Sequence, residues 1–307
     1  MADLLGRFAP SPSGAMHLGN ARTALLAWLD ARARGGRIVL RIEDLDRDRC
    51  RPQFAAAIRD DLRWLGLDWD AETAQQSART AAYEAAIERL AAGGLVYECF
   101  CTRRELAVAS APHGAAGIAP CPRRCHDLSE GERDDLRRQG RRAALRVRMP
   151  AGTARVEDRL HGGVRVPIGP DPVVRRSDGL HAYQLAVVVD DAADAVTDVV
   201  RGDDLLASAG TQLELARMLG LPGVSYAHVP LVLGPDGARL AKRHGAVTIA
   251  ELRDCGRSAA SLVGEMASSF GAGDGSPCAP DALLAGFDLA AIRREPWLQI
   301  VDSPMGR

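Results

Sequence analysis

The chain has 307 residues, 47% of them hydrophobic, and a formal net charge of −1 at pH 7. This length allows one large domain or two modest ones with a substantial core. The near-zero charge excludes a uniformly basic nucleic-acid coat, so an RNA partner would have to meet local basic patches. No apolar stretch of about 18 residues and no signal-peptide pattern is found, so we expect a cytoplasmic protein with no membrane partner.

Residues 6–29 contain the first structural signal, a short strand followed by a turn and a helix start. A β-like segment at Arg7 leads into a Pro/Ser/Gly-rich turn at 10–14, and HLGN at 17–20 opens a run of helical periodicity. Such a helix start favours phosphate binding, because free backbone N–H groups point out of its end. The P-loop and GxGxxG patterns are both absent, and HLGN alone is equally compatible with an ordinary helix start.

The next elements alternate between strands and helices. An apolar run at 36–43 is expected as a buried strand that ends in the acidic cluster 43–46. Helical periodicity follows at 53–65 and again at 81–90. This alternation favours an α/β fold, in which helices pack on the faces of a parallel sheet.

The composition changes at about residue 96, and we interpret residues 96–175 as an insertion within the α/β domain. A strand is expected at 144–149, with loops and short strands at 162–171.

The α/β pattern then returns, with apolar strands expected at 183–191, 197–200 and 229–233. After a basic loop, the rest of the chain is expected to be helical, with a Gly/Ser/Pro-rich break at 271–280.

Four of the seven cysteines form two close pairs, Cys99-x-Cys101 and Cys121-xxx-Cys125. In a cytosolic chain such clustering favours a metal over disulfides. Four thiolates can complete a closed tetrahedral zinc site, although the spacing is not a standard zinc-finger pattern. His126 is an alternative fourth ligand, and a set of unliganded thiols is the structural alternative.

The loop at 239–245, RLAKRHG, is strongly basic. One interpretation is a solvated charged surface, because charge runs are usually exposed. The other is a mobile phosphate clamp, in which Lys242 acts as a point charge with Arg239 and Arg243 beside it.

A further group of polar residues is expected at strand ends and in the first turn, namely Arg7, Ser11, Glu43, Tyr183 and Arg201. In an open α/β sheet, ligands bind outside the carboxyl ends of the strands. Arginines bind carboxylates bidentately, and a glutamate can hold an ammonium group. Together these residues suit an amino acid with a second carboxylate, and only their shared location favours this function, because each one alone is better explained as a surface or salt-bridge residue.

Six motifs together resemble the class I glutamyl-tRNA synthetases over about residues 6–245. In chain order they are RFAPSPSGAMHLGNART, LRIEDLDRDR, AYQLAVVVDD, VVRGDDLL, YAHVPLVLGPDG and RLAKRHG. The combination is highly specific, because each motif needs its own strand, turn or helix context. HLGN is similar to the HIGH element of this class, with Asn20 in place of the final histidine.

RLAKRHG is similar to the KMSKS loop of the same class. Arg239 stands at the first lysine and Lys242 at the second, while Ala241 and Arg243 stand at the two serines. The loop therefore stays cationic but lacks both hydroxyls, so its contact with phosphate is expected to differ from the family's.

Chain length separates two groups within this family. A full synthetase continues into a large helical anticodon-binding region, whereas only residues 246–307 follow the KMSKS-like loop. The chain therefore resembles the truncated group, the glutamyl-queuosine tRNA(Asp) synthetases. This implies a class I Rossmann-like catalytic domain in two halves (1–95 and 176–236), an acceptor-binding-like insertion with zinc (96–175), and a KMSKS-like loop with a short helical region (237–307).

The resemblance implies a ligase that activates glutamate with ATP and Mg²⁺ to glutamyl-adenylate without tRNA. The enzyme then transfers the glutamyl group to queuosine in the anticodon of tRNA(Asp). The residues implied for ATP are His17, Gly19, Asn20, Arg239 and Lys242, with His17 and Lys242 as the catalytic pair.

For glutamate, the resemblance implies that Arg7 reads the side-chain carboxylate and Arg201 the α-carboxylate. Glu43 and Tyr183 hold the ammonium, and Ser11 completes the pocket. We expect a monomer. The alternatives are a truncated glutamyl-tRNA synthetase that charges a tRNA 3′ end and a non-catalytic tRNA-binding paralogue.

In the truncated group the insertion binds one structural zinc ion, commonly with a tyrosine among its ligands. Cys121 stands at that position here, so the implied ligands are Cys99, Cys101, Cys121 and Cys125. This exchange is compatible with zinc, because a thiolate is a good zinc ligand.

Overall fold

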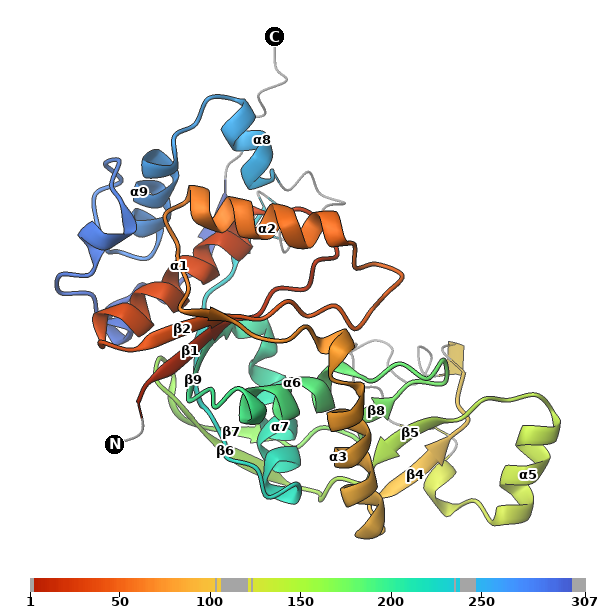
Figure 1. The fold of residues 1–307 in the computed structure, drawn as a ribbon. Coiled ribbons are helices and arrows are strands. Elements are labelled where there is room, and N and C mark those ends of the chain that lie inside the picture. Colours follow the sequence, from red (N-terminus) through yellow and green to blue (C-terminus); the bar gives the residue numbers. More distant parts are fainter. Residues whose placement is uncertain are drawn as a thin grey trace.

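The computed structural model describes residues 3–102, 104–105, 121–122, 124–234, 236–237 and 247–299. A seven-stranded sheet forms its centre, in the order β3-β2-β1-β9-β10-β6-β7 (Figure 1). The strands are β1 (Leu5–Phe8), β2 (Arg37–Leu40), β3 (Ala71–Glu72), β6 (Thr153–Asp158), β7 (Gly162–Pro167), β9 (Asp198–Gly202) and β10 (Ser225–Val229). Neighbours pair in parallel except β6 and β7, which form an antiparallel hairpin at one edge.

Helices cover both faces of this sheet. They are α1 (Leu18–Ala33), α2 (Pro52–Trp64), α3 (Thr80–Ala92), α6 (Tyr183–Ala193) and α7 (Leu206–Met218). Figure 1 shows α1 and α2 on one side of the sheet and α6 and α7 on the other. Helix α1 is mostly buried and shares a core cluster with α2 and the C-terminal helices, whereas α3, α6 and α7 share a second cluster. The α/β class I arrangement expected from the sequence is therefore confirmed.

Chain order places a switch in direction at the middle of the sheet. The first strands run outward from β1 to β2 and β3, and the later ones run outward from β9 to β10 on the other side. In α/β sheets, ligands bind at such a switch point, outside the carboxyl ends of the strands.

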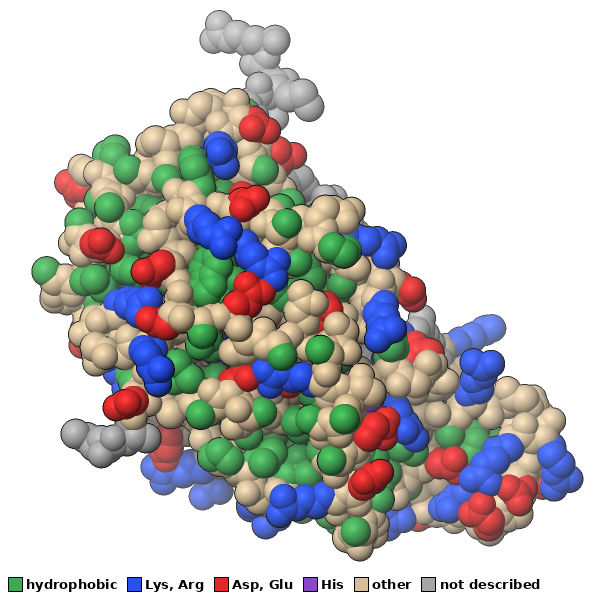
Figure 2. All heavy atoms as spheres, in the orientation of Figure 1, with side chains coloured by type: hydrophobic (Ala, Val, Ile, Leu, Met, Phe, Trp, Pro, Cys, Tyr) green, Lys and Arg blue, Asp and Glu red, His purple; other side chains and the backbone are tan. Residues whose placement is uncertain are grey.

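The remaining elements lie outside this sheet. The antiparallel strands β4 (Val96–Cys99), β5 (Ala144–Val147) and β8 (Val173–Arg175) form a separate sheet, with α5 (Glu130–Arg138) beside it. Figure 2 shows side chains of both charges gathered over α5. The C-terminal part contains α8 (Ile249–Asp254), α9 (Ala259–Ser269) and β12 (Trp297–Leu298), which pairs with β11 (Val232–Leu233). Short 3-10 helices span Gln76–Ala78, Cys125–Asp127, Asp203–Leu205, Pro280–Leu283 and Leu289–Ala291.

No helix within the described ranges combines the length and the apolar character needed to cross a membrane.

Most of the local predictions are confirmed. The strand expected at 36–43 is β2, and the helices expected at 53–65 and 81–90 are α2 and α3. The strands expected at 144–149 and 197–200 are β5 and β9.

The prediction of a strand at 183–191 is wrong, because this segment is helix α6. Residues 184–191 are all buried, and the helix packs against both α3 and α7. Three successive valines favour a strand locally, but burial on all sides permits either structure and tertiary packing overrides the preference.

The strand expected at 229–233 is divided in two. Strand β10 ends at Val229, and the chain resumes as β11 at Val232, beyond Pro230. Proline interrupts the pairing because it has no backbone N–H to donate to a neighbouring strand. The carbonyl of Pro230 instead accepts a hydrogen bond from Arg22 at 2.6 Å.

The segment interpreted as an insertion, 96–175, contributes to two sheets. Strands β4, β5 and β8 form the separate sheet, whereas the β6–β7 hairpin extends the central one through the pairing of Asp158 with Tyr226. The division of the chain into domains stays a prediction.

Helix α7 crosses the β6–β7 hairpin at Gly210, so a side chain there should destabilise the fold. A Cβ atom on Gly210 would lie 2.8 Å from the carbonyl oxygen of Pro167. We expect Gly210→Ala to lower the free energy of unfolding by about 1–3 kcal/mol, because the backbone must move apart. Urea unfolding measures this change. Gly131→Ala in α5 is the matched control, since a Cβ there meets open space, and an equal loss in both variants would contradict the close-packing explanation.

Candidate active site

A cavity of about 870 Å³ opens at the switch point between β1 and β9. All described residues that the sequence predicted for ATP or glutamate line it, namely Arg7, Ser11, His17, Gly19, Asn20, Glu43, Tyr183 and Arg201. The structure therefore brings these side chains together. Arg239 and Lys242, with Ala241 and Arg243, lie outside the described residues.

The HLGN segment forms the start of α1, as predicted. His17 is the N-cap residue, and its Nδ1 accepts a hydrogen bond from the backbone N–H of Asn20 at 3.3 Å. A Cβ on Gly19 would lie 3.1 Å from the imidazole ring, so glycine allows the ring to fold over the first turn. The start of a mostly buried helix is thus directed at the cavity, where its N–H groups favour an anion.

Both described ends of the basic-loop segment lie close to this helix start. Before the loop, Val232 of β11 lines the cavity. After it, Thr248 forms a β-bridge with His17, and the N–H of Ile249 donates to the carbonyl of Met16 at 2.9 Å. Described residues on either side of the basic loop therefore contact the cavity wall or the helix start beside it.

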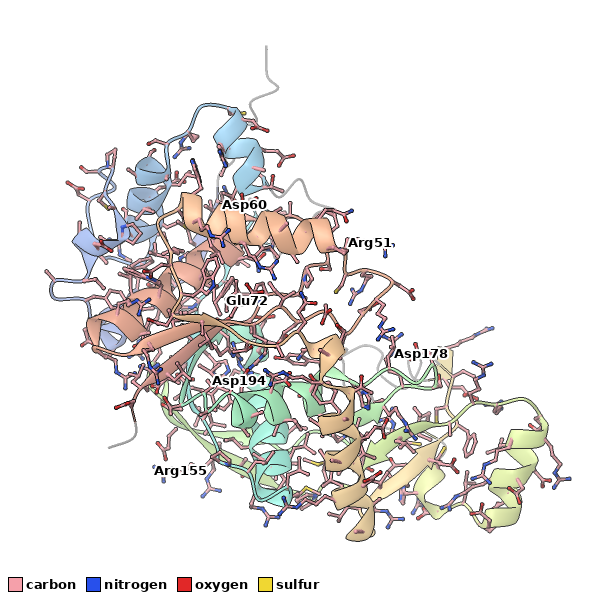
Figure 3. The ribbon with its side chains drawn as sticks, in the orientation of Figure 1. Arg51, Asp60, Glu72, Arg155, Asp178 and Asp194 are labelled. Atoms are coloured by element: carbon pink, nitrogen blue, oxygen red, sulfur yellow. The ribbon has the colours of Figure 1, made fainter. Side chains whose placement is uncertain are left out.

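A buried ionic network lies behind the glutamate-site residues. The guanidinium of Arg41 is fully buried and contacts Asp191 at 2.5 Å, Asp194 at 3.0 Å and Glu43 at 3.5 Å. Asp194 follows the end of α6, where Figure 3 labels it, and Arg79 contacts it from outside the helix.

Burial and neighbouring charges act on these carboxyl groups in opposite directions. Burial raises the pKa of Glu43 above its ordinary value, although Arg41 and Arg7 oppose this rise. Burial also acts on Asp191, but the guanidinium groups of Arg7 and Arg41 outweigh it and hold the pKa of Asp191 below its ordinary value. Asp191 is thus an anion that orients Arg7, whose Nε lies 3.5 Å from it.

Arg201, at the end of β9, has a different set of partners. Its Nε donates to Nε2 of His228 at 2.9 Å, and its Nη1 donates to Oε1 of Gln212 at 2.7 Å. His228 in turn donates from Nδ1 to Asp158 at 2.6 Å. The guanidinium also lies over the ring of Tyr226, 4.5 Å from its centroid.

The sequence did not single out Arg41, Asp191, His228, Asp158 or Gln212. Arg41, Asp191 and His228 stand inside quoted motifs, and the available signal was a charged or polar side chain within an otherwise apolar strand or helix. Such residues are almost never fully buried unless they are paired, so their position itself indicates a partner elsewhere in the chain.

The four predicted zinc ligands converge outside the cavity. The sulfur atoms of Cys99, Cys101, Cys121 and Cys125 all lie within 4.8 Å of one another. Individual Sγ–Sγ distances are 3.5, 3.6 and 3.8 Å, and a tetrahedral zinc ion with bonds of about 2.3 Å requires about 3.8 Å. The imidazole of His126 lies against Asp127 instead and is not part of the group. The donor set and its dimensions fit zinc.

The fold is that of a class I synthetase catalytic domain. Residues 3–268 match the family of class I tRNA synthetases (E and Q), catalytic domain. A crystal structure of a glutamate tRNA ligase from Elizabethkingia meningosepticum superposes with a TM-score of 0.81 at 27% identity, covering 96% of this chain and 67% of that one.

Curated relatives place the chain more closely. It is 54% identical to the glutamyl-Q tRNA(Asp) synthetase of Nocardia farcinica, over 95% of this chain and 92% of that protein. Its identity to the synthetase of the same name from Symbiobacterium thermophilum is 51%, over 95% of each. Glutamate–tRNA ligase 1 of Methylorubrum extorquens is 43% identical over 94% of this chain, but over 61% of the ligase. The chain therefore belongs to the class I tRNA synthetases (E and Q) and, among them, to the glutamyl-Q tRNA(Asp) synthetases.

Removing the buried cation of the network should be strongly destabilising at neutral pH. In Arg41→Met, Asp191 loses its nearest cation and Asp194 keeps only Arg79, which should cost about 3–5 kcal/mol. Without it, burial would raise the carboxyl pKa values above those of the unfolded chain, so the folded variant would bind protons more tightly. The difference in the free energy of unfolding between the parent and Arg41→Met should therefore shrink as the pH falls from 7 to 5.

Urea unfolding of both proteins at the two pH values measures this effect. Arg138→Met is the control, because Arg138 is an exposed residue paired within α5 and such pairs contribute little. A difference in the free energy of unfolding that stays constant with pH would contradict the electrostatic explanation.

Proposed function

We propose that this ligase activates glutamate with ATP and Mg²⁺ and transfers the glutamyl group to queuosine in the anticodon of tRNA(Asp). The observation that carries the proposal is a single cavity at the switch point, in which two buried arginines and a buried glutamate face an open helix start. The names of the two most similar relatives described above support the substrate and the tRNA.

We assign the binding roles by charge. Arg7 binds the side-chain carboxylate of glutamate, and Arg201 binds the α-carboxylate. Glu43 and Tyr183 hold the ammonium group, with Ser11 in the adjoining turn. The raised pKa of Glu43 is consistent with this role, because a bound cation would offset the cost of burying its charge.

The first step joins the α-carboxylate to ATP. One carboxylate oxygen attacks the α-phosphorus, a P–O bond forms, and the bond to the leaving pyrophosphate breaks. The nucleophile is already an anion, so no general base is needed and the rate comes from positioning and charge stabilisation. His17, Gly19 and Asn20 receive the phosphates at the helix start, and Mg²⁺ neutralises part of their charge.

Lys242, with Arg239, is proposed to stabilise the charge on the departing pyrophosphate. The attachment of Thr248 to His17 supports this assignment, because it keeps the chain after the basic loop at the same helix start. In the second step a queuosine hydroxyl oxygen bonds to the adenylate carbonyl carbon, the bond from that carbon to the phosphate oxygen of AMP breaks, and the hydroxyl proton is released to solvent as AMP leaves.

We also propose that the protein works as a monomer and in the cytoplasm. Within the described ranges, Leu298 is the large hydrophobic side chain that stands exposed. Stable dimers are usually built on larger apolar patches.

Transfer of labelled glutamate tests the proposed reaction. The purified protein should acylate tRNA(Asp) that carries queuosine and should leave unmodified tRNA(Asp) unlabelled, because the acceptor hydroxyl belongs to the modified base. Glutamate-dependent exchange between ATP and pyrophosphate should proceed without any tRNA.

Two controls separate the alternatives. Charging of tRNA(Glu) at its 3′ end would favour the glutamyl-tRNA synthetase activity, which the Methylorubrum relative's name suggests. Absence of both exchange and transfer would favour a non-catalytic tRNA-binding protein.

We further propose that Cys99, Cys101, Cys121 and Cys125 hold one structural zinc ion. When bound, the ion would cross-link the end of β4 to the segment at 121–125 and stabilise the separate sheet. Metal analysis of protein purified without chelators should find about one equivalent of zinc per chain.

Cys121→Ser should lose most of this zinc and melt at a lower temperature, because a serine hydroxyl is a poor zinc ligand. Cys255→Ser, an exposed thiol outside the cluster, should retain the metal and the melting temperature. Full zinc content in Cys121→Ser would rule out the four-thiolate site.

A further inference from the structure

Arg201 is held in place by a chain of buried polar side chains that begins outside the cavity. Arg201 is 4% exposed, His228 0% and Asp158 3%. His228 lies on β10, and Asp158 is the last residue of β6, which pairs with β10. Arg155, three residues earlier on β6, points to solvent (Figure 3), as expected for the opposite face of the strand.

All four of the recorded partners of the Asp158 carboxylate are N–H donors. Oδ1 accepts hydrogen bonds from the backbone N–H groups of Leu160 and His161, both at 2.9 Å. Oδ2 accepts from the backbone N–H of His228 at 3.0 Å and from its ring Nδ1 at 2.6 Å. This arrangement places the imidazole proton on Nδ1 and leaves the lone pair on Nε2 available as an acceptor.

The Nε2 lone pair of His228 is directed at Arg201. It accepts the Nε–H of Arg201 at 2.9 Å. Burial lowers the pKa of His228 below its ordinary value, so the ring remains neutral and can accept this hydrogen bond. A protonated ring would place an N–H donor against the guanidinium.

Two more acceptors complete the support of Arg201. Oε1 of Gln212 accepts from Nη1 at 2.7 Å, and the carbonyl of Leu205 accepts from Nη2 at 3.2 Å. The Gln212 amide is itself oriented, because its Nε2 donates to Gln184 at 3.0 Å. Within the described part of the chain, these contacts use three of the five guanidinium N–H groups. One N–H on each terminal nitrogen is left for the cavity, and that pair suits a carboxylate.

We propose that Asp158 and His228 are positioning residues that fix the Arg201 guanidinium for the α-carboxylate of the amino acid. The β6–β7 hairpin thereby controls the affinity of the site for the amino acid, whereas ATP binds independently of it. The proposal rests on the proposed function for the identity of the amino acid, glutamate.

Two substitutions of His228 provide the test. His228→Leu keeps the bulk and removes the acceptor, whereas His228→Gln offers Oε1 near the position of Nε2. In glutamate-dependent ATP–pyrophosphate exchange, we expect His228→Leu to raise the KM for glutamate about tenfold, with the KM for ATP within about twofold of the parent. His228→Gln should recover most of the affinity for glutamate.

Thr211→Val is the matched control, because Thr211 is equally buried and its hydroxyl accepts from Gly169 away from Arg201. It should lower the melting temperature and leave the KM for glutamate unchanged. If His228 had only a structural role, His228→Leu would lower the melting temperature without changing the KM for glutamate, or would raise the KM values for glutamate and ATP equally. Either result would overturn the proposal.

Asp158→Asn supplies a second, independent variant. Either orientation of the new amide places its NH₂ group against two N–H donors, and no charged carboxylate remains, so the ring of His228 is held less firmly. The KM for glutamate should rise as in His228→Leu, and the double variant should show no further rise because both changes break one chain of contacts. Additive increases in the KM for glutamate would contradict a single chain of contacts from Asp158 through His228 to Arg201.

Calorimetric titration with glutamate separates this proposal from the reaction itself, since it requires no adenylate. If the parent binds glutamate but shows no exchange, the proposed activity is rejected. In that case a tenfold higher Kd for glutamate in His228→Leu would still support the positioning role. If the parent binds no glutamate, both proposals fail.

Discussion

The burial of one cation among several carboxylates is the interaction on which the rest of the site depends. Arg41 follows directly from β2, and its partners Asp191 and Asp194 come from the end of α6, on the far side of the sheet from α1. The ion pairs therefore link the residue after β2 to the end of α6, about 150 residues later in the chain. Arg7 and Glu43 line the cavity and both contact this network, so the cavity and the core share one set of charges. Such a network is costly to desolvate, and it is stable only while every member is paired.

The two arginines of the cavity are held by different means. Arg7 is oriented by an anion, Asp191, whereas the recorded hydrogen bonds of Arg201 go to the neutral acceptors His228, Gln212 and Leu205. Neutral acceptors orient a guanidinium without cancelling its charge. The recorded hydrogen bonds of Arg201 therefore leave its positive charge available to an anion in the cavity, which it lines.

The parts that could be predicted from the sequence are those set by local patterns. The helix start at His17 and the cysteine pairs were found because turn residues, periodicity and spacing are local signals. Co-location of Arg7, Glu43 and Arg201 followed from the rule for strand ends. The helix at 183–193 was missed because a fully buried helix and a buried strand have the same apolar composition. Partners such as Asp158 and His228, 70 residues apart, cannot be paired by any local signal.

The pairing of β6 with β10 has a consequence for how sequences of this type can vary. Asp158 meets His228 because it lies opposite Tyr226, two residues before His228 on β10. Loops before β6 can lengthen or shorten at little cost, since loop entropy grows slowly with length. A slip of the strand by one position would instead turn every side chain to the opposite face and replace Asp158 by a neighbour. Insertions within β6 should therefore be far rarer among functional descendants than insertions in the loops on either side.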